Sequence, residues 1–365
     1  MLKLDSPLQL APVFKPKIWG RRDLAPLYPD FWTTWRGEKV GIHYPQREGS
    51  RSEPIGEVWL TGDNSVFVNG PLAGTTLGEA CARYCEELCG CHACGQRFPL
   101  LAKFLFTSDW LSVQVHPDDH YARTREPGST GKCEMWYVLE AERGAEFLLG
   151  VKRGVTSAQF GAALDGGTSS EMLRRFRPQS GEAVFVPPGT IHALGPGIIL
   201  LEVEQNSDVT YRLDDFGRKG PGGEKRPLHR ENGLQVARFE LPPLRGLPRF
   251  EFPEDYGARR LVLACPHFAV EELTLREIIS AAGTGRVEAF AVLSGDGRVE
   301  TQAGWYAYRV GHVWLVPPGS ASYRLVPEIE SHIVKFYVPN LDEDFRKPLA
   351  ARGVPRADTN KVIFV

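Results

Sequence analysis

The chain of 365 residues has a formal charge of −2, with 42% hydrophobic and 24% charged residues. The length suits two domains, and the near-neutral charge excludes a nucleic-acid binder that works by bulk charge, so any anionic ligand must be met by a few local Lys and Arg residues. Because no apolar run could span a bilayer and residues 1–20 lack the apolar core of a signal peptide, we expect a cytoplasmic protein that binds neither nucleic acid nor membrane.

Over most of the chain the hydrophobic pattern predicts short β-strands separated by Gly/Pro turns, which favours sandwiches or barrels over helical bundles. The expected strands of the first half are Gly56–Thr61, Leu100–Phe106, Leu111–His116, Cys133–Leu139, Ala183–Val186 and Ile198–Val203. Those of the second half are Phe268–Leu273, Val287–Leu293, His312–Val316 and His332–Val338. Helical patterns are confined to Thr76–Leu88, Ser157–Leu164 and Ser170–Phe176.

An internal repeat indicates how these elements are organised. "EMWYVLEAERGAEFLLG" resembles "EAFAVLSGDGRVETQAG", and "GEAVFVPPGTIHAL" resembles "GHVWLVPPGSASYRL". Each pair reads as a strand, a turn and another strand, followed later by a strand that ends in V-P-P-G. We therefore expect a mainly β fold made of two jelly-roll barrels, over 1–239 and 240–365, with a small helical insertion near 76–95 and 157–177. Pro-rich Glu240–Asp255 is the expected linker.

Five of the seven cysteines crowd into "CARYCEELCGCHAC", which has two interpretations. Cys81, Cys85 and Cys89 have the spacing of one helix face, which would pack small apolar thiols. A metal site is the alternative, because Cys-x-x-Cys has ligand spacing, although no second such pair completes a finger. Its candidate ligands are Cys89, Cys91, His92 and Cys94.

Polar residues at strand positions separate the two copies of the repeat. Gln114 and His116 stand two residues apart in an expected strand, so their side chains share one face. In the first copy V-P-P-G leads to His192, whereas Ser322 stands at the matching position of the second copy. We therefore expect the chemistry in the first copy, since the second has dropped most of its inward polar groups.

With Glu134, which opens another expected strand, these residues predict a metal site. The candidate ligands are Gln114, His116, Glu134 and His192, and together they offer one amide oxygen, two imidazoles and one carboxylate. Buried without a cation, such groups would be poorly satisfied. A divalent metal resolves the conflict, and mixed N and O ligands suit one Zn²⁺ per chain with an open position for water or substrate.

Three basic residues occur near these candidate ligands in the sequence. Lys103 lies within the apolar run "FPLLAKFLF", Lys132 stands two residues before Glu134, and Arg212 follows His192 in "DVTYRLDD". Each could form an ordinary surface ion pair. A metal site surrounded by three cations should instead bind an anion such as a phosphate or carboxylate.

At this point the residues resemble a known family, the type I mannose-6-phosphate isomerases of the cupin superfamily. The resemblance is carried by "PLLAKFLFTSDWLSVQVHPDD", "GKCEMWYVLEA", "VPPGTIHALGPGIILLEVEQNSDVTYRLDDFGR" and "RPLH", with support from "KPKIWG", "IGEVWLTG" and "VFVNGPLAGTTLGE". It covers Lys15 to about His229, and the last part of the chain resembles a degenerate second cupin only in general pattern. The resemblance implies two cupin-like barrels and zinc bound by the four residues named above.

The implied reaction interconverts mannose 6-phosphate and fructose 6-phosphate through a cis-enediolate. The resemblance further implies active-site roles for Lys103, Lys132, Glu202 and Arg212, and a contact of Ser112 with the substrate phosphate. We expect Arg212 and Lys132 to stabilise the enediolate oxygen or to transfer protons, and Glu202 to be the general base. Lys103 and Ser112 are the expected substrate-binding residues. We expect the protein to be a monomer or a weak dimer.

The chain departs from the family pattern at three positions. The family more often has Thr at Cys133, a second Gln near Glu204 and Tyr at Asp214. None of these departures removes a ligand, so they bear on substrate preference and fine positioning more than on reaction class.

Two other functions fit parts of the same pattern. A non-haem iron oxygenase would use His116, His192 and Glu134 as a facial triad, but Gln114 and the three cations argue against it. A non-catalytic sugar-phosphate sensor would need no acid or base beside the metal. Iron content with O₂-dependent turnover would identify the oxygenase, and tolerance of Glu202→Gln would identify the sensor.

Overall fold

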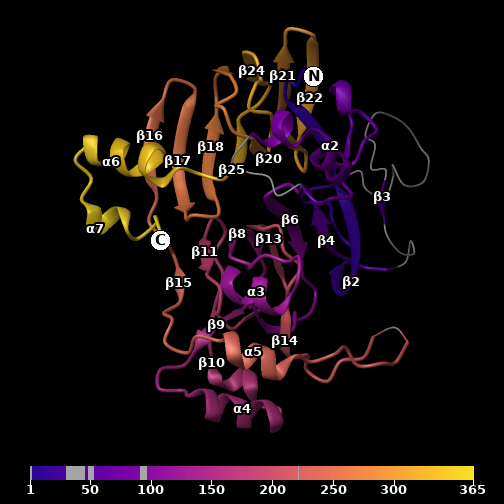
Figure 1. The fold of residues 1–365 in the computed structure, drawn as a ribbon, viewed down its shortest axis with the longest axis vertical. Helices are drawn as coiled ribbons and strands as arrows, with labels where there is room; N and C mark the ends of the chain where they lie inside the picture. Colours follow the sequence, from indigo (N-terminus) through magenta and orange to yellow (C-terminus); the bar gives the residue numbers. More distant parts are fainter. Residues whose placement is uncertain (1, 30–45, 48–52, 91–96, 221) are drawn as a thin grey trace.

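The structure is a computed structural model that describes residues 2–29, 46–47, 53–90, 97–220 and 222–365. Over these residues the chain forms four β-sheets and a few short helices, and the sheets make two halves that lie one above the other along the long axis of Figure 1. We call these halves the first barrel and the second barrel. The expected mainly β class with paired antiparallel sheets is observed.

The first barrel is built from an eight-stranded and a five-stranded sheet. The larger sheet has the spatial order β15-β11-β8-β13-β6-β4-β2-β3, with bounds β2 (Val13–Arg21), β3 (Gln46–Arg47), β4 (Ile55–Trp59), β6 (Leu100–Phe106), β8 (Glu134–Ala141), β11 (Ala183–Val186), β13 (Ile198–Gln205) and β15 (Leu244–Arg245). The smaller sheet has the order β10-β9-β12-β7-β14, with bounds β7 (Val113–Val115), β9 (Phe147–Val151), β10 (Leu173–Phe176), β12 (His192–Leu194) and β14 (Tyr211–Asp214).

The second barrel repeats this plan with an eight-stranded and a four-stranded sheet. The larger sheet has the order β16-β17-β18-β25-β20-β23-β1-β5, with bounds β1 (Leu8–Ala11), β5 (Val66–Phe67), β16 (Phe250–Glu254), β17 (Gly257–Ala264), β18 (Ala269–Leu275), β20 (Glu288–Ser294), β23 (Val313–Val316) and β25 (Ser331–Tyr337). The smaller sheet has the order β19-β24-β21-β22, with bounds β19 (Ile279–Ala281), β21 (Asp296–Thr301), β22 (Gly304–Arg309) and β24 (Tyr323–Pro327).

Short helices lie at the outside of the sheets in Figure 1. They are η1 (Gly70–Leu72), α2 (Leu77–Cys89), α3 (Asp119–Arg125), α4 (Ser157–Asp165), η2 (Ser169–Met172), α5 (Arg230–Val236), η3 (Asp342–Arg346), α6 (Lys347–Ala351) and α7 (Arg356–Thr359). Among the described residues no helix has the length and apolar composition needed to cross a membrane.

Each expected strand begins and ends within two residues of an observed one, and two of the three expected helices are confirmed. The third expected helix, Ser170–Phe176, is wrong in its second part. Its first residues form η2, and Leu173–Phe176 form β10, which pairs with β9 and so satisfies its backbone groups in the sheet.

Helix α2 contains part of the cysteine cluster. Its N-terminus is fixed by a capping box in which Thr76 and Glu79 each accept from the other's backbone N–H. Cys81 and Cys89 are buried against the core, as the helix-face interpretation predicts, whereas Cys85 is only half-buried. The proposed ligands Cys91, His92 and Cys94 lie outside the described residues.

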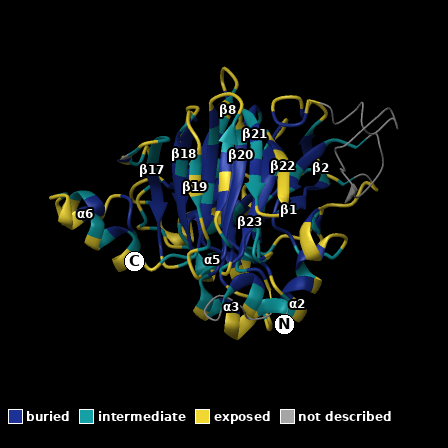
Figure 2. Cartoon of the chain, turned by 90° about the horizontal axis from the view of Figure 1, so that it is seen from above, coloured by how far each residue is buried: buried dark blue, intermediate teal, exposed yellow. Residues whose placement is uncertain are grey.

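The alternation of side chains along the strands sets the two faces of the larger sheets. One face of each sheet packs against the other barrel in a shared apolar core, for example Phe104 and Met135 from the first barrel with Val334 and Phe336 from the second. The strands lie buried at the centre of the molecule, seen from above in Figure 2. The opposite face of each large sheet points into its own barrel, which is where a site can form.

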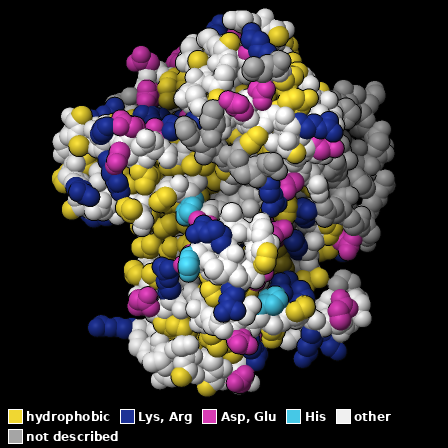
Figure 3. Space-filling view, in the orientation of Figure 1, with side chains coloured by type: hydrophobic (Ala, Val, Ile, Leu, Met, Phe, Trp, Pro, Cys, Tyr) yellow, Lys and Arg dark blue, Asp and Glu magenta, His cyan; other side chains and the backbone are white. Residues whose placement is uncertain are grey.

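The linker and the N-terminus connect the halves. Within the expected linker, β15 joins the sheet of the first barrel and β16 joins that of the second. β1, from the start of the chain, pairs with β23 in the second barrel. A boundary between residues 239 and 240 remains a prediction. On the face shown in Figure 3, Lys and Arg side chains lie scattered among acidic and apolar ones.

Candidate active site

The residues expected from the sequence gather at one cavity inside the first barrel. The cavity measures about 280 Å³. Six of the predicted residues line it: Lys103, Ser112, Gln114, Lys132, Glu202 and Arg212. The other three, His116, Glu134 and His192, are buried and in contact with that group.

The four candidate ligands converge on one point. His116 Nε2 lies 3.4 Å from one oxygen of Glu134, and His192 Nε2 lies 3.2 Å from the other. The Gln114 amide group lies 3.2 Å from His192 Nε2, and either of its two ends can face that space. Gln114 and His116 do share a face, as predicted, because Val113 and Val115 pack on the opposite side.

A tight turn holds the two histidines together. Gly189 of the V-P-P-G turn has φ 87°, a conformation that favours glycine. Its N–H donates to the carbonyl of His116 at 2.9 Å, which ties the end of β7 to the segment leading into His192. Each imidazole is oriented by its Nδ1, which lies 2.9 Å from the carbonyl of Val209 for His116 and of Thr190 for His192.

Both imidazoles are neutral at physiological pH. Burial lowers the pKa of His192 to about 4. Burial, followed by the charge of Lys132, lowers the pKa of His116 well below its ordinary value. Since each Nδ1–H donates to a carbonyl, each Nε2 carries a lone pair, which is the form that binds a metal.

Glu134 is the least satisfied group of this centre. Its side chain is 0% exposed, yet neither of its oxygens has a hydrogen bond in the described part of the chain, and neither has His116 Nε2. Burial, and then repulsion from Glu202, raises the pKa of Glu134 to about 7 although Lys132 opposes the rise. A buried carboxyl group that accepts no hydrogen bond, stands between two neutral imidazoles and has its nearest ammonium group 3.5 Å away is a donor set suited to a further cation.

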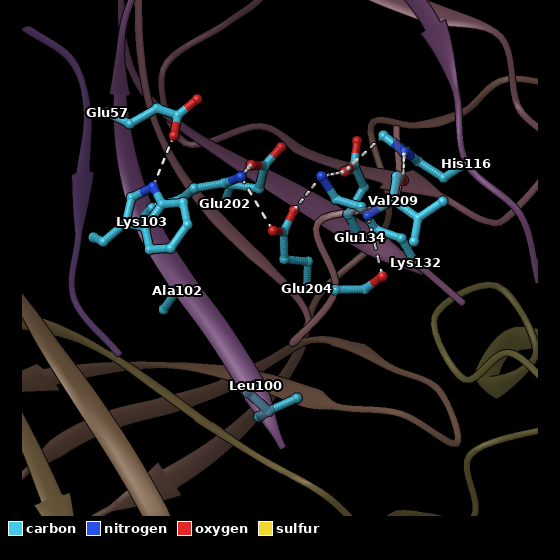
Figure 4. Close-up of polar contacts among 12 residues, drawn as sticks. Glu57, Leu100, Ala102, Lys103, His116, Lys132, Glu134, Glu202, Glu204 and Val209 are labelled. Atoms are coloured by element: carbon cyan, nitrogen blue, oxygen red, sulfur yellow. Dashed lines mark hydrogen bonds and ion pairs between the residues drawn. The ribbon is translucent and has the colours of Figure 1, made fainter. Parts of the chain in front are cut away.

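Beside this centre lies a buried cluster of carboxyl and ammonium groups, drawn in Figure 4. Lys103 Nζ lies 2.8 Å from Glu202 and 3.1 Å from Glu204. Lys132 Nζ lies 3.0 Å from Glu204 and 3.5 Å from Glu134. Three carboxyl groups therefore surround two ammonium groups.

The lysines of this cluster are charged. Burial alone would lower the pKa of Lys103, but Glu202 and Glu204 outweigh it and raise the pKa well above its ordinary value. Burial likewise opposes a rise in the pKa of Lys132, which Glu204 produces. Burial would raise the pKa of Glu202, but Lys103 and Lys132 hold that pKa low, so Glu202 is ionised.

The pKa of Glu204 is shifted in the opposite direction to that of Glu202. Burial raises its pKa well above the ordinary value in spite of the two lysines. Glu134, Glu202 and Glu204 form a second group whose oxygens lie within 4.8 Å of one another. Lys103 and Lys132 lie 2.8–3.1 Å from Glu202 and Glu204, so these two carboxyl groups need no metal, whereas Glu134 lies farther, at 3.5 Å, from an ammonium group.

Glu202 is held from two sides. One of its oxygens accepts from Trp136 Nε1 at 2.9 Å, and the other pairs with Lys103. Trp136 also packs against His192, with ring centroids 5.4 Å apart. Trp136 therefore links the ionised carboxylate to the candidate metal centre.

The open side of the cavity carries arginines. Arg212 donates from Nη1 to the carbonyl of Pro227, while its buried Nε has no acceptor among the described residues. Arg226 lines the same cavity, and Asp215 accepts from its Nε at 2.8 Å. Ser112 is buried, and its hydroxyl donates to Gln114 Oε1 at 3.3 Å. This side can bind an anion.

Sequence reasoning missed part of this site. It noted Glu204 only as a departure from the family pattern and did not consider Glu57, which lines the cavity and accepts from Trp59 Nε1 at 2.7 Å. The available signal was the alternation in β13, which places Glu204 on the face of Glu202. Two other acidic residues brace the turn after β7: Asp118 caps α3, and Asp119 accepts from Gly131 N–H.

Comparison with known proteins defines the class of this fold and site. The family model of the phosphomannose isomerase type I catalytic domain matches residues 8–142. The crystal structure of the mannose 6-phosphate isomerase from Bacillus subtilis covers 92% of this chain and 100% of its own, with 27% identity and a TM-score of 0.79. A putative mannosephosphate isomerase from Archaeoglobus fulgidus shares the fold, with a TM-score of 0.66, 18% identity and coverage of 93% and 99%. The fold is of the cupin type.

Relatives of known name place the chain within that class. Mannose-6-phosphate isomerase ManA of Bacillus subtilis (strain 168) is 35% identical over 324 residues, which are 88% of this chain and 96% of that protein. A mannose-6-phosphate isomerase of Streptococcus mutans is 33% identical over 331 residues, 90% and 97% of the two chains. The chain belongs to the type I phosphomannose isomerase family, the family that its sequence resembles, and it is an enzyme of that family.

Proposed function

We propose that this enzyme interconverts mannose 6-phosphate and fructose 6-phosphate through a cis-enediolate, with one Zn²⁺ held by Gln114, His116, Glu134 and His192. The main support for the metal centre is the convergence of two neutral imidazole Nε2 atoms on the oxygens of buried Glu134, which accept no hydrogen bond among the described residues. The members of the family are metalloenzymes. The activity itself is supported by the named relatives over most of the chain.

The charges of the site suit a divalent cation. The cluster holds three carboxyl groups, Glu134, Glu202 and Glu204, against the ammonium groups of Lys103 and Lys132. When all five groups are ionised, their net charge is −1. Binding of a divalent cation brings the net charge of the site to +1. Burial raises the pKa of Glu134 and of Glu204, so binding of the cation would release protons from them. A site with one positive charge then favours an anionic intermediate.

The choice of zinc rests on the donor set. Two imidazole nitrogens, one carboxylate and one amide oxygen are the mixed ligands that Zn²⁺ accepts. When bound, Zn²⁺ would supply Lewis-acid stabilisation of the negative charge that develops on the sugar oxygen.

The reaction moves a proton between C2 and C1 of the open-chain sugar. We assign the proton transfer to Glu202, whose ionised carboxylate lines the cavity and is oriented by Trp136 and Lys103. Lys132 and Arg212 line the same cavity and would stabilise the enediolate oxygen or move its proton.

Binding of the substrate is assigned to Ser112 and Lys103. Ser112 would contact the phosphate, and the ammonium group of Lys103, already paired with Glu202, would contact the sugar. Fixing the phosphate away from the reacting carbons orients C1 and C2 through binding energy that is not used in the chemical step.

The test is an assay of mannose 6-phosphate conversion together with metal analysis of the same preparation. We expect about one Zn²⁺ per chain, loss of isomerisation on chelation, and recovery when Zn²⁺ is returned. Full activity of the chelated apoprotein would overturn the metal centre. Iron in place of zinc, with turnover that requires O₂, would identify an oxygenase instead.

The role of Glu202 needs a separate variant. Glu202→Gln keeps the shape of the side chain and removes the base, so we expect kcat to fall by about 10²–10⁴-fold while bound substrate still protects the protein from heat. A sensor would show no turnover in the parent protein either. An active Glu202→Gln variant would transfer the base assignment to another group.

A further inference from the structure

We propose that Glu204 is a positioning residue: it holds the ammonium group of Lys132 away from Glu134, so that Glu134 stays available to the cation. The inference rests on the proposed metal centre and adds a role for a residue that the reaction does not use. Glu204 is 0% exposed, does not line the substrate cavity and is not one of the four candidate ligands, so we expect it to act on the site through its neighbours.

The register of the strands explains why Glu204 is placed between the lysines. β13 pairs with β8 so that Glu204 stands opposite Glu134, and it pairs with β6 so that Glu202 stands opposite Lys103. Glu204 therefore reaches both Lys103 Nζ, at 3.1 Å, and Lys132 Nζ, at 3.0 Å. In Figure 4 its carboxyl group lies between the two lysine side chains.

The distances show which partner Lys132 would take if Glu204 were replaced by glutamine. Lys132 Nζ lies 3.0 Å from Glu204 and 3.5 Å from Glu134, the two carboxyl groups within ion-pair distance among the described residues. Lys132 is itself buried, so its charge requires a carboxylate close by. Without the charge of Glu204, the ammonium group would pair with Glu134 and compete with the cation for the same oxygens.

The electrostatics point in the same direction. Once binding of the cation has released the proton of Glu204, the three carboxylates and two ammonium groups leave the bound site with one positive charge. With a neutral residue at 204 the same site would carry two positive charges, and Lys132 would face the cation across a shared carboxylate. Partners that orient a metal ligand are worth about 10–100-fold in metal affinity.

The experiment measures Zn²⁺ affinity of Glu204→Gln by competition with a chromophoric chelator at constant pH. We expect affinity at least about 10-fold weaker than in the parent protein, and an altered visible spectrum when Co²⁺ is bound. Glu271→Gln is the matched control: Glu271 is also 0% exposed and pairs with a lysine at 3.0 Å, but in the second barrel. This control should lose stability to a similar degree and keep the parent affinity and spectrum.

A double-mutant cycle with Lys132→Met separates positioning from bulk charge. If Glu204 acts through Lys132, the effect of Glu204→Gln on Zn²⁺ affinity shrinks to less than about threefold once Lys132 is Met, since no ammonium group is left to compete. Equal effects in both backgrounds, or unchanged affinity of Glu204→Gln, would overturn the inference while leaving the proposed function intact. Absence of a metal site from the parent protein would overturn both.

Discussion

The two barrels place buried charges at the same strand positions with the signs exchanged. In the first barrel Lys103 on β6 faces Glu202 on β13, with their charged atoms 2.8 Å apart. In the second barrel Glu271 on β18 faces Lys335 on β25, with their charged atoms 3.0 Å apart. The expectation that the second copy has dropped most inward polar groups is therefore only partly right: Ser322 stands in place of His192, but a buried ion pair remains.

The difference lies in how the remaining charges are satisfied. Glu288 in β20 is the counterpart of Glu134 in β8. Glu134 pairs with Val186, the last residue of β11, and Glu288 pairs with Val316, the last residue of β23. Glu288 accepts from the hydroxyl of Thr284 and lies 3.7 Å from Lys335. Glu134 lies 3.5 Å from Lys132 but accepts no hydrogen bond among the described residues. The second barrel neutralises its charges internally, whereas the first leaves a carboxylate for a cation.

Replacing His192 of the first barrel and its counterpart Ser322 of the second by alanine should give the largest difference in zinc content and activity. His192→Ala removes one candidate ligand, so we expect loss of bound Zn²⁺ and a fall in kcat/KM of more than about 100-fold, because even partners of a metal ligand are worth 10–100-fold. Ser322→Ala, at the matching position, should change neither. Metal analysis and the isomerase assay measure both, and equal zinc loss in the two variants would refute a division of labour between the barrels.

Removing one lysine from each buried pair should separate stability from activity. Lys335→Met removes one of the two cations that pair with Glu271 and leaves Arg259 at 2.6 Å, so we expect the free energy of unfolding to fall by about 1.5–3 kcal/mol with kcat unchanged in the folded protein. Lys103→Met should lose stability and also activity. Denaturant unfolding and steady-state kinetics provide the measurements. Loss of kcat in a folded Lys335→Met variant would show that the second barrel takes part in catalysis.

The sequence predicts the strands and the meeting of the candidate ligands well because both depend on local patterns. Gln114 and His116 share a face through the period of a strand, and V-P-P-G positions His192 through a turn that needs a positive φ at Gly189. The partners of the lysines depend instead on strand register. Nothing local to Lys103 or Glu204 specifies that β13 lies between β6 and β8, so their contact could not be read from the chain.

Replacing Trp136 by phenylalanine, the residue at the equivalent place in the second barrel, tests the hydrogen bond that Trp136 donates to Glu202. Trp136 faces Glu202 in β13, and Phe290 faces Lys335 in β25 at the equivalent place. Trp136→Phe keeps a ring against His192 but removes the donor to Glu202. A hydrogen bond to a charged group contributes about 1.5–3 kcal/mol, so we expect kcat to fall by about 10-fold with zinc content unchanged. Unaltered kcat would mean that Glu202 is oriented by Lys103 alone.

The smallest effect concerns a histidine of the second barrel. Burial lowers the pKa of His312 to about 4, the same value as for His192, but its Nδ1 accepts from the Gln9 amide and faces no carboxylate pair. The unfolded chain therefore binds a proton at His312 below about pH 6.5, whereas the folded protein does so only near pH 4. This contribution to stability is complete above pH 6.5 and is lost as the pH falls toward 4.

The measurement for His312 is urea unfolding of the parent protein and of His312→Gln at pH 7 and pH 5. Because glutamine does not titrate, the parent protein should lose about 2 kcal/mol more than the variant between these two pH values. Parallel losses would mean that His312 is already protonated in the folded protein at pH 5. Burial would then be too weak to keep His312 neutral at pH 5. The low pKa of His192, which we also attribute to burial, would need a further cause.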